Sequence, residues 1–256
     1  MKRTVIIALA LLVSVFSAKA HEADSTAENG RDRLEKLEQL ADKAKEVKAK
    51  KAEKLVNFEM IHRFGFGSHP FLGDDFSGKL MKKREIWMNA FDLSFNPARW
   101  FSASFGMNLK WDRFTASGSN YLYADAANGN LPKFAPIATQ QALYPGAAGD
   151  FNQLSSQLNM FSLEVPLAIA FRVEDLGIRL GAEAVVPLTA TQKEKADYAN
   201  TVSETKVKKV AKVPYYYGAY AEINYDDLGL YVKYMPTTVV PGMVEDLITV
   251  GLVFGF

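Results

Sequence analysis

Residues 101–112 read Phe-Ser-Ala-Ser-Phe-Gly-Met-Asn-Leu-Lys-Trp-Asp, and this stretch has the clearest alternation in the chain. Apolar side chains occupy every second position from Phe101 to Trp111, while small or polar side chains occupy the positions from Ser102 to Asp112. A hydrophobic period of two predicts a β-strand with one apolar face. The strand is therefore expected to separate a charge-free surface from a polar one.

Seven more segments of the chain repeat this alternation, and turn-forming residues separate them. The eight segments lie within residues 56–66, 87–96, 101–112, 161–172, 178–186, 215–225, 228–234 and 248–256. Several alternating segments of this kind predict an all-β antiparallel fold. Pairing of the last segment, which ends at Phe256, with the first, which begins near Val56, would close the sheet into a barrel without a free edge.

The chemistry of the two faces is the reverse of that in a soluble barrel. The apolar face is bulky and almost free of charge, whereas the other face mixes small residues with charged ones. We therefore predict an eight-stranded antiparallel transmembrane β-barrel with a narrow lumen filled by ion pairs. A one-residue slip of residues 101–112 would put Lys110 into lipid, at a cost of about 2–4 kcal/mol. The lumen ion-pair candidates are Glu59, Arg63, Asp92, Lys110, Asp112, Glu164, Arg179, Glu183, Glu222 and Lys233.

The lengths of the connections give a second signal. Those after the second, fourth and sixth segments are short, namely residues 96–99, 174–176 and 226–227, and the others are longer. Short periplasmic turns alternate with long external loops in outer-membrane barrels. Both termini are therefore expected in the periplasm, with residues 115–155 as the longest external loop. The lysine-rich residues 204–213 are expected to lie in a loop or in a strand that projects beyond the bilayer.

The first 55 residues have a different character from the segments that follow. Residues 1–20 combine Lys2 and Arg3, a short apolar run and Ala18-Lys19-Ala20, which is the pattern of a cleaved signal peptide. Residues 21–55 are predicted to form a polar tail and a charged periplasmic helix, and residues 56–256 the barrel. The helix, within residues 31–55, is either a solvated spacer or a docking segment for a periplasmic protein partner.

Composition excludes several classes of function. The 30 basic and 29 acidic residues give a net charge of +1, which disfavours nucleic acid as a partner. Cysteine is absent, which removes thiol catalysis, Cys-based metal sites and disulfides. A mean hydropathy near zero argues against a bundle of apolar transmembrane helices. Aromatic residues make up 12% of the chain, which suits the aromatic girdles of a membrane barrel.

A few positions fit the alternation poorly. His62 and Asn89 fall on the predicted lipid face, and Ile86 and Met88 fall on the predicted inner face. Leu158 and Met160 break the expected parity of their segment, and a β-bulge would explain the break.

Two motifs carry a resemblance to a known class of protein. Residues 250–256, Val-Gly-Leu-Val-Phe-Gly-Phe, resemble the terminal strand of outer-membrane barrels. This resemblance implies that Phe254 and Phe256 form an assembly signal, read by the barrel assembly machinery. Residues 95–101 and 228–236 resemble the small porin-like (PorT-like) barrels of Bacteroidota, with the eight-stranded architecture of OmpA/OmpX-like proteins. The resemblance covers residues 56–256 and implies the outer membrane of a Gram-negative envelope, without an activity.

Candidate sites for chemistry are few. Ser68 and His69, with Asp74 or Asp75 nearby, contain the residue types of a hydrolytic site, but adjacency in a loop does not align a nucleophile with its base. No metal or cofactor site is predicted, and no catalytic residue is assigned. Two basic clusters, residues 79–84 and 206–212, either contact lipopolysaccharide phosphates or are solvated loop charges.

These observations predict a non-enzymatic outer-membrane barrel with a structural or interaction role and with membrane lipid and lipopolysaccharide as neighbours. Three alternatives stay open at this point: a small-solute channel, a lipid A-modifying enzyme, and an accessory subunit of an envelope complex.

Overall fold

The computed structural model describes residues 55–60, 62–72, 75–77, 79–117, 120–136, 151–198 and 201–255. The expected signal peptide and charged helix lie outside the described residues, apart from Leu55, and so does Phe256. Among the described residues, no helix is long and apolar enough to cross a membrane. The elements are β1 (Val56–Glu59), β2 (Arg63–Ser68), η1 (Leu80–Lys82), β3 (Arg84–Ala98), β4 (Phe101–Thr115), β5 (Asn120–Asp125), η2 (Ala126–Asn128), β6 (Leu131–Pro136), β7 (Phe151–Val173), β8 (Leu176–Tyr198), β9 (Thr201–Lys208), β10 (Tyr216–Tyr225), β11 (Leu228–Met235) and β12 (Leu247–Gly255).

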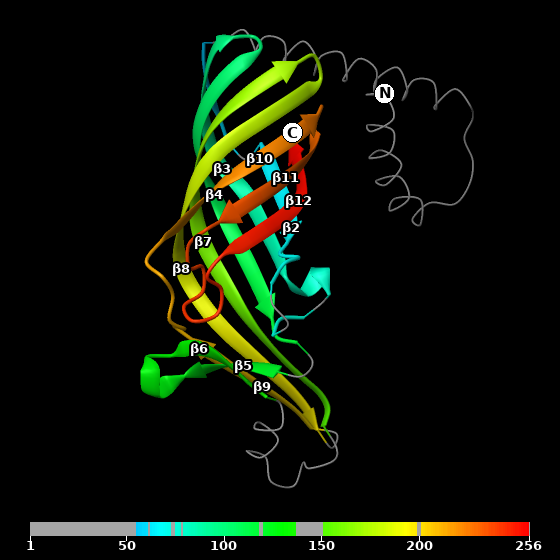
Figure 1. The fold of residues 1–256 in the computed structure, drawn as a ribbon, viewed down its shortest axis with the longest axis vertical. Helices are drawn as coiled ribbons and strands as arrows, with labels where there is room; N and C mark the ends of the chain where they lie inside the picture. The colour runs from blue at the N-terminus through cyan, green and yellow to red at the C-terminus, as the bar shows by residue number, and fades with distance from the viewer. Residues whose placement is uncertain are drawn as a thin grey trace, which may run out of the picture. The chain divides into compact units, whose positions relative to one another are not determined.

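Eight strands close into a ring (Figure 1). The order is β2, β3, β4, β7, β8, β10, β11 and β12, and β12 pairs with β2 again, so that the sheet has no open edge around the ring. Each pairing around the ring is antiparallel. The predicted eight-stranded antiparallel barrel is therefore confirmed. The first predicted segment is divided into β1 and β2, both of which pair with β3.

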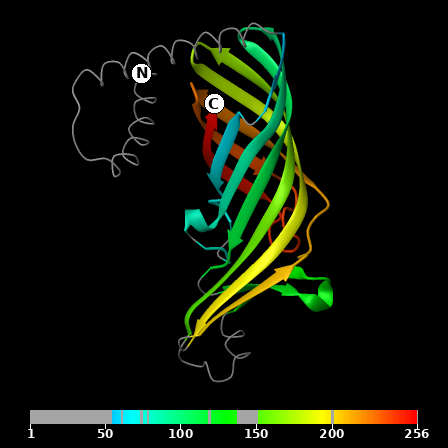
Figure 2. The ribbon, with the colours of Figure 1, turned by 180° about the vertical axis from the view of Figure 1, so that it is seen from behind.

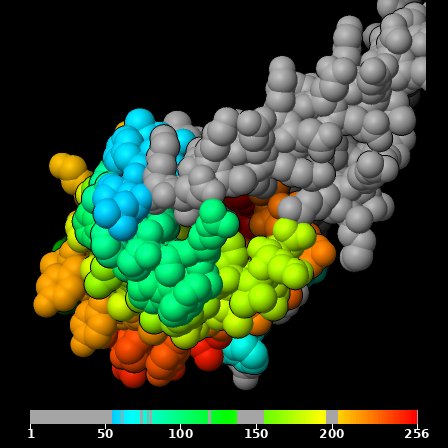
Figure 3. Space-filling view, turned by 90° about the horizontal axis from the view of Figure 1, so that it is seen from above, coloured from blue at the N-terminus to red at the C-terminus, as the bar shows by residue number. Residues whose placement is uncertain are grey.

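Two-residue turns join β3 to β4, β7 to β8 and β10 to β11, and they lie at the same end of the ring as Gly255. We call this the turn end; Figure 3 looks onto it, with the β3–β4 turn in green beside the β7–β8 turn in yellow-green. Glu174 and Asp226 each begin a turn with a φ of 53° and 57°, the left-handed conformation that two-residue hairpin turns use.

The opposite, far end of the ring carries additional structure. Strands β7 and β8 are 23 residues long, and β9 pairs with the part of β8 that continues past the ring. Strands β5 and β6 form a separate two-stranded hairpin. The backbone N–H of Ala211, which follows β9, donates to the carbonyl of Asn130 at the end of this hairpin (Figure 2). The predicted long connection after β4 therefore contains a hairpin, and the lysine-rich segment contains a projecting strand.

The outward face of the ring is apolar. On β4, the side chains of Phe105 and Trp111 are exposed, as are those of Leu167 and Ile169 on β7. The same holds for the outward residues of the other strands, which include Leu93, Ile178, Leu180, Ile223, Leu230, Val232, Val250, Leu252 and Phe254. We call this surface the apolar belt.

One predicted orientation is wrong in β3. The register of β3 against β4 shifts between Asn89 and Phe91, which marks a bulge at Ala90. Trp87 and Asn89, predicted to face lipid, are 4% and 2% exposed and point into the lumen. Ile86 and Met88, predicted to face inward, alternate with them and point outward. The bulge adds one residue to β3 and so reverses the parity before it.

The expected break in β7 is also absent. Even-numbered residues from Ser156 to Ala168 are buried without interruption, and Leu158 and Met160 are among them. The register shift beside these residues lies in β8, where Phe161 pairs with Thr189 and Ser162 with Pro187, which leaves Leu188 as the extra residue; a second shift, between Phe151 and Gln153, lies near the start of β7. Leu158 and Met160 therefore face inward. At their height in the barrel the lumen is lined by apolar side chains instead of charged ones.

Candidate functional site: the filled lumen

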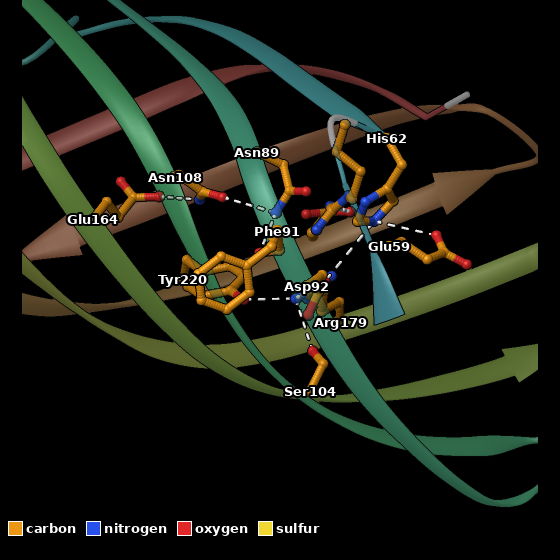
Figure 4. A network of polar contacts seen from close by, with 12 residues as sticks. Glu59, His62, Asn89, Phe91, Asp92, Ser104, Asn108, Glu164, Arg179 and Tyr220 are labelled. Atoms are coloured by element: carbon orange, nitrogen blue, oxygen red, sulfur yellow. Dashed lines mark hydrogen bonds and ion pairs between the residues drawn. The ribbon is translucent and has the colours of Figure 1, made fainter. Parts of the chain in front are cut away.

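An arginine cluster fills the lumen near the turn end (Figure 4). Arg179 donates to Asp92 at 3.2 Å, to Ser104 at 2.8 Å and to the Tyr220 hydroxyl at 3.2 Å. Arg63 pairs with Glu222, which also accepts from Asn224 at 2.6 Å. These contacts join strands β2, β3, β4, β8 and β10 across the interior. We define the arginine cluster as Arg63, Asp92, Arg179 and Glu222.

His62 lies beside this cluster. Its Nε2 is 3.7 Å from Glu59 and 3.9 Å from Asp92 (Figure 4). The predicted lipid-facing orientation of His62 is therefore wrong. Its position in the short break between β1 and β2, opposite the bulge of β3, lets the ring turn toward the lumen carboxylates.

A lysine cluster fills the middle of the lumen. The Lys110 ammonium lies 2.7 Å from Glu85, 3.6 Å from Asp112 and 3.9 Å from Glu164. The Lys233 ammonium lies 2.6 Å from Glu164, 3.3 Å from Glu85 and 3.4 Å from Glu183. Each of these side chains is at most 3% exposed. We define the lysine cluster as Lys110, Lys233, Glu85, Asp112, Glu164 and Glu183.

Two asparagines connect the clusters. Asn89 donates to Asn108 at 3.2 Å, and Asn108 donates to Glu164 at 2.7 Å. A cavity of about 10 Å³, the room that roughly one water molecule needs, lies against Asn89, Asn108 and Glu164 and reaches Arg179 of the arginine cluster. The lumen between the clusters is therefore packed with side chains.

The lumen carries more acidic than basic groups. Four cations, Arg63, Lys110, Arg179 and Lys233, face six carboxylates, two in the arginine cluster and four in the lysine cluster. The formal charge of the two clusters is therefore −2, without counting His62 and His69. A lumen of this sign would attract cations and repel anions.

Aromatic rings form one wall of the lysine cluster. The Lys233 ammonium lies 5.4 Å from the Trp87 ring centre and 5.5 Å from that of Tyr231, a cation–π geometry. The Tyr231 hydroxyl donates to Glu85 at 2.9 Å. Gly65 lies against the Trp87 indole so closely that a Cβ on it would overlap the ring. The absence of a side chain at Gly65 makes room for Trp87.

An apolar plug occupies the lumen at the far end. Phe114, Leu158 and Tyr216 are at most 1% exposed and belong to it. The remaining members are Phe76, Leu122, Met160, Val185, Ala190, Val210, Met235, Val239, Val240, Val244 and Leu247. The β5–β6 hairpin is fixed over it by hydrogen bonds from Leu122 to Ser156 at 2.5 Å and from Gln192 to Leu122 at 2.7 Å.

His69 lies where the lysine cluster meets the apolar plug. Its Nδ1 is 2.9 Å from the Thr249 hydroxyl and its Nε2 is 3.5 Å from Asp112, while its ring stacks on Phe114 at 5.1 Å. A hydroxyl next to an imidazole that is itself next to a carboxylate is the arrangement of a nucleophilic site. His69 is 0% exposed and Thr249 is 1% exposed, so a substrate has no access to the pair. The Ser68 hydroxyl bonds to the carbonyl of Lys83 and is not directed at His69.

All ten predicted ion-pair candidates have charged neighbours inside the ring. Nine of them belong to the two clusters, together with Glu85, and the arginine cluster contains Asp92 and Glu222 from opposite sides of the ring. Glu59 is the outlier, because its neighbour is His62 and a quarter of its side chain is exposed. Sequence reasoning missed Glu85, Trp87, Tyr216 and the apolar plug. The mismatched parity of Ile86 and Met88 was the signal that could have identified Glu85.

The two basic clusters of the sequence differ in exposure: Lys206, Lys208, Lys209 and Lys212 are exposed, whereas one lysine of the first cluster is buried. Lys83 is 3% exposed and its ammonium is 3.4 Å from the carbonyl of Pro70, so it is not available at the surface. Lys206 and Lys208 lie on β9, and Lys79 is exposed. Within the described ranges, no group of three His, Asp or Glu side chains is arranged to hold a metal ion.

Comparison with known proteins yields weak structural similarity alone. No family model matches the sequence, and no curated protein matches it. A double mutant of the Rhodopseudomonas blastica porin matches 78% of this chain and 100% of its own at 10% identity, with a TM-score of 0.19. LpxR from Salmonella typhimurium matches 78% of this chain and 87% of its own at 10% identity, with a TM-score of 0.23.

Proposed function

We propose that the chain is an integral outer-membrane barrel with a filled lumen and a structural or interaction role. The observation that carries the proposal is the inversion of burial around the ring. Lys110 and Glu85 are 0% exposed, whereas Leu167 and Leu230 are each 62% exposed. Soluble monomers rarely expose apolar surface on this scale, whereas a lipid-facing barrel requires it.

The height of the apolar belt supports the same proposal. From Phe101 to Trp111, β4 presents only apolar outward side chains over ten residue steps, about 34 Å at 3.4 Å per residue. At a strand tilt of about 45°, this corresponds to roughly 24 Å along the barrel axis, close to the ~25 Å apolar band of membrane barrels. The short turns and Gly255 lie at one end, which favours periplasmic termini.

Flotation of the full chain with membranes, together with heat-modifiable migration in gels, tests this proposal. The wild-type protein is expected to float with outer-membrane vesicles and to resist a urea wash. Leu167→Arg places a cation in the middle of the apolar belt and is expected to reduce insertion by about 2–4 kcal/mol. A wild-type protein that stays soluble without detergent would overturn the proposal.

The proposed lumen is closed to solutes. The two charged clusters fill it from the turn end to its middle, and the apolar plug fills the far end. Planar-bilayer recording is expected to give no reproducible open state. The opposite result, a large and cation-selective conductance, would favour the small-solute channel, because the lumen has an acidic excess.

We also propose that the barrel is not an enzyme. The Thr249–His69–Asp112 arrangement is enclosed between the lysine cluster and the apolar plug, where a lipid could not reach it. Mass spectra of lipid A from a deletion strain are expected to match the wild type. Altered acylation would point instead to a lipid A-modifying enzyme.

The interaction role is assigned to the two ends of the chain. Residues 31–55, which apart from Leu55 lie outside the described residues, are proposed to dock a periplasmic partner, as an accessory subunit of an envelope complex would. Phe254 pairs with Phe64 on the outward face, and Phe254 with Phe256 is proposed as the signal for the barrel assembly machinery. The docking role is tested by comparing the proteins that co-purify with the wild type and with a variant that lacks residues 31–55. The same partners in both samples would refute the docking role. Deletion of Phe256 is expected to reduce assembly.

A further inference from the structure

Two arginines lie directly opposite each other on the outward face of the ring. The register of β3 against β4 pairs Arg84 with Arg113, and both side chains are partly exposed. The preceding outward row contains Ile86, Trp111 and Phe161, of which the last two are in ring contact at 5.1 Å. Arg84 and Arg113 therefore occupy the first row beyond the apolar belt, toward the far end.

This pair lacks the partner that its charge requires. Like charges directly opposite on neighbouring strands destabilise a sheet. Among the described residues, no carboxylate lies within ion-pair distance of either guanidinium, and Arg113 Nε donates to the amide oxygen of Asn159 at 3.0 Å. That hydrogen bond fixes the Arg113 side chain while its terminal nitrogens stay available for an external acceptor.

The row to which the arginines belong is composed of polar residues without an acid. Strand pairing aligns Ser68, Arg84, Arg113, Asn159, Thr191 and Lys208 across β2, β3, β4, β7, β8 and β9. The next row adds Lys193 opposite Lys206. A band of cations and hydrogen-bond donors thus follows the edge of the apolar belt on this side of the barrel.

We propose that Arg84 and Arg113 bind the phosphate of a lipid headgroup in the leaflet at the far end. In an outer membrane that lipid is lipopolysaccharide, and its phosphates belong to lipid A. Arginine binds phosphate with two parallel hydrogen bonds, and one phosphate placed between two guanidinium groups removes their repulsion. The acyl chains of the same lipid would lie against Trp111 and Phe161. The inference rests on the proposed membrane location.

Binding of lipid A to the purified full chain in detergent micelles tests the site. Native mass spectrometry would compare lipid A with its dephosphorylated form. Arg84→Gln and Arg113→Gln are each expected to weaken binding of lipid A about tenfold, as loss of a charge-assisted hydrogen bond does. Lys195→Gln is the control, because Lys195 is exposed on β8 beyond both rows. Equal binding of the two lipid forms, or of lipid A to all variants, would overturn the site.

A charge reversal gives a second readout that does not depend on loss of binding. Arg113→Glu places a carboxylate opposite Arg84, where opposite charges stabilise a strand pair. Without lipid, this variant is expected to melt at a higher temperature than the wild type, and lipid A should not raise its melting temperature further. Inorganic phosphate that protects the wild type as well as lipid A does would reduce the site to a general anion site and overturn the lipid assignment.

Failure of this inference can be separated from failure of the membrane proposal. Arg84→Gln and Arg113→Gln leave the apolar belt intact, so both variants are expected to float with membranes like the wild type. If these two variants float with membranes and still bind lipid A as tightly as the wild type, the phosphate site is refuted but the membrane location is not. Absence of flotation in the wild type would refute the membrane location, on which the site depends.

Discussion

The lysine cluster and the apolar plug are neighbouring parts of one lumen with opposite chemistry. Along β7, the inward residues Leu158 and Met160 belong to the plug, and Glu164 belongs to the lysine cluster only four residues later. The outward residues Phe161 and Leu163, which lie where one region passes into the other, are both apolar. The outward pattern therefore determines the fold, whereas the inward face can be filled either by paired charges or by apolar side chains.

The two regions differ in what happens when a side chain is lost. In the lysine cluster, each buried lysine is paired with three carboxylates, so that removal of a lysine leaves buried ions without compensation. In the apolar plug, a truncated side chain leaves a cavity but no uncompensated charge. This difference can therefore be tested with one substitution in each region, each compared with the same substitution at an exposed position.

Lys233→Met is expected to have the largest effect. The substitution leaves Glu183 without its cation and leaves Glu85 and Glu164 to Lys110 alone, and we expect a loss of about 3–5 kcal/mol in the free energy of unfolding. Urea titration of the protein in detergent micelles measures this. Lys193→Met is the matched control, because the Lys193–Glu204 pair has side chains 41% and 56% exposed and should contribute below about 1 kcal/mol. Similar losses for both variants would contradict the buried network.

Leu158→Ala is expected to have the next largest effect. Leu158 is 1% exposed in the apolar plug, and truncation of a buried leucine costs about 3 kcal/mol through lost burial and a residual cavity. The same urea titration applies. Leu167→Ala, on the outward face of the same strand, is the control and should change stability in detergent much less. A smaller effect at Leu158 than at Leu167 would show that the plug is not packed.

Gly65→Ala tests the wall of the lysine cluster. A methyl group at Gly65 would overlap the Trp87 indole, and overpacking of this kind costs about 1–3 kcal/mol. Gly177→Ala is the control, since the nearest atoms to a Cβ there lie 3.9 Å away. Tryptophan fluorescence should also shift in the first variant, because Trp87 must move. Unchanged stability and fluorescence would mean that Trp87 does not lie against β2.

The fold could be predicted from the sequence because lipid-facing and lumen-facing residues alternate over long strands. Residues 101–112 alternate without a fault, and the structure extends the same strand as β4. The predicted orientation was wrong before Ala90, because one extra residue in β3 exchanges the inward and outward faces. A single-residue bulge leaves no strong mark on the composition of a strand, so the sequence did not reveal it. Glu85 was missed for this reason alone.

The contents of the lumen were less predictable than its walls. Charged inward residues could be identified strand by strand, but their partners, such as Arg63 with Glu222, come from strands 159 positions apart in the chain. The apolar plug was missed because inward apolar residues such as Leu158 look like errors of parity when a charged lumen is assumed. Loop residues such as Phe76 and Val240 join the plug through tertiary packing that no local pattern encodes.

The smallest expected effect concerns a partly exposed ion pair that serves as the reference for the buried ones. Lys133 donates to Asp125 on the β5–β6 hairpin at 2.7 Å, the same distance as between Lys110 and Glu85 in the lumen. The hydrogen bond from Lys133, with a second from Asn128, lowers the pKa of Asp125. Because the folded value lies below the ordinary one, the hairpin's stabilisation is complete above the ordinary aspartate pKa and is lost as pH falls through the folded value.

Lys133→Met isolates this contribution. Nuclear magnetic resonance titration of the Asp125 carboxyl is expected to give a lower midpoint in the wild type than in the variant, because the largest cause of the lowered pKa has been removed. Global stability should hardly change, since water screens a partly exposed pair. Lys233→Met is expected to cost far more stability than Lys133→Met, although the ammonium–carboxylate distances are similar. Burial of the ion pair, and not its distance, decides how much the charge contributes to stability. Identical midpoints in both proteins would show that the Lys133–Asp125 contact does not form in solution.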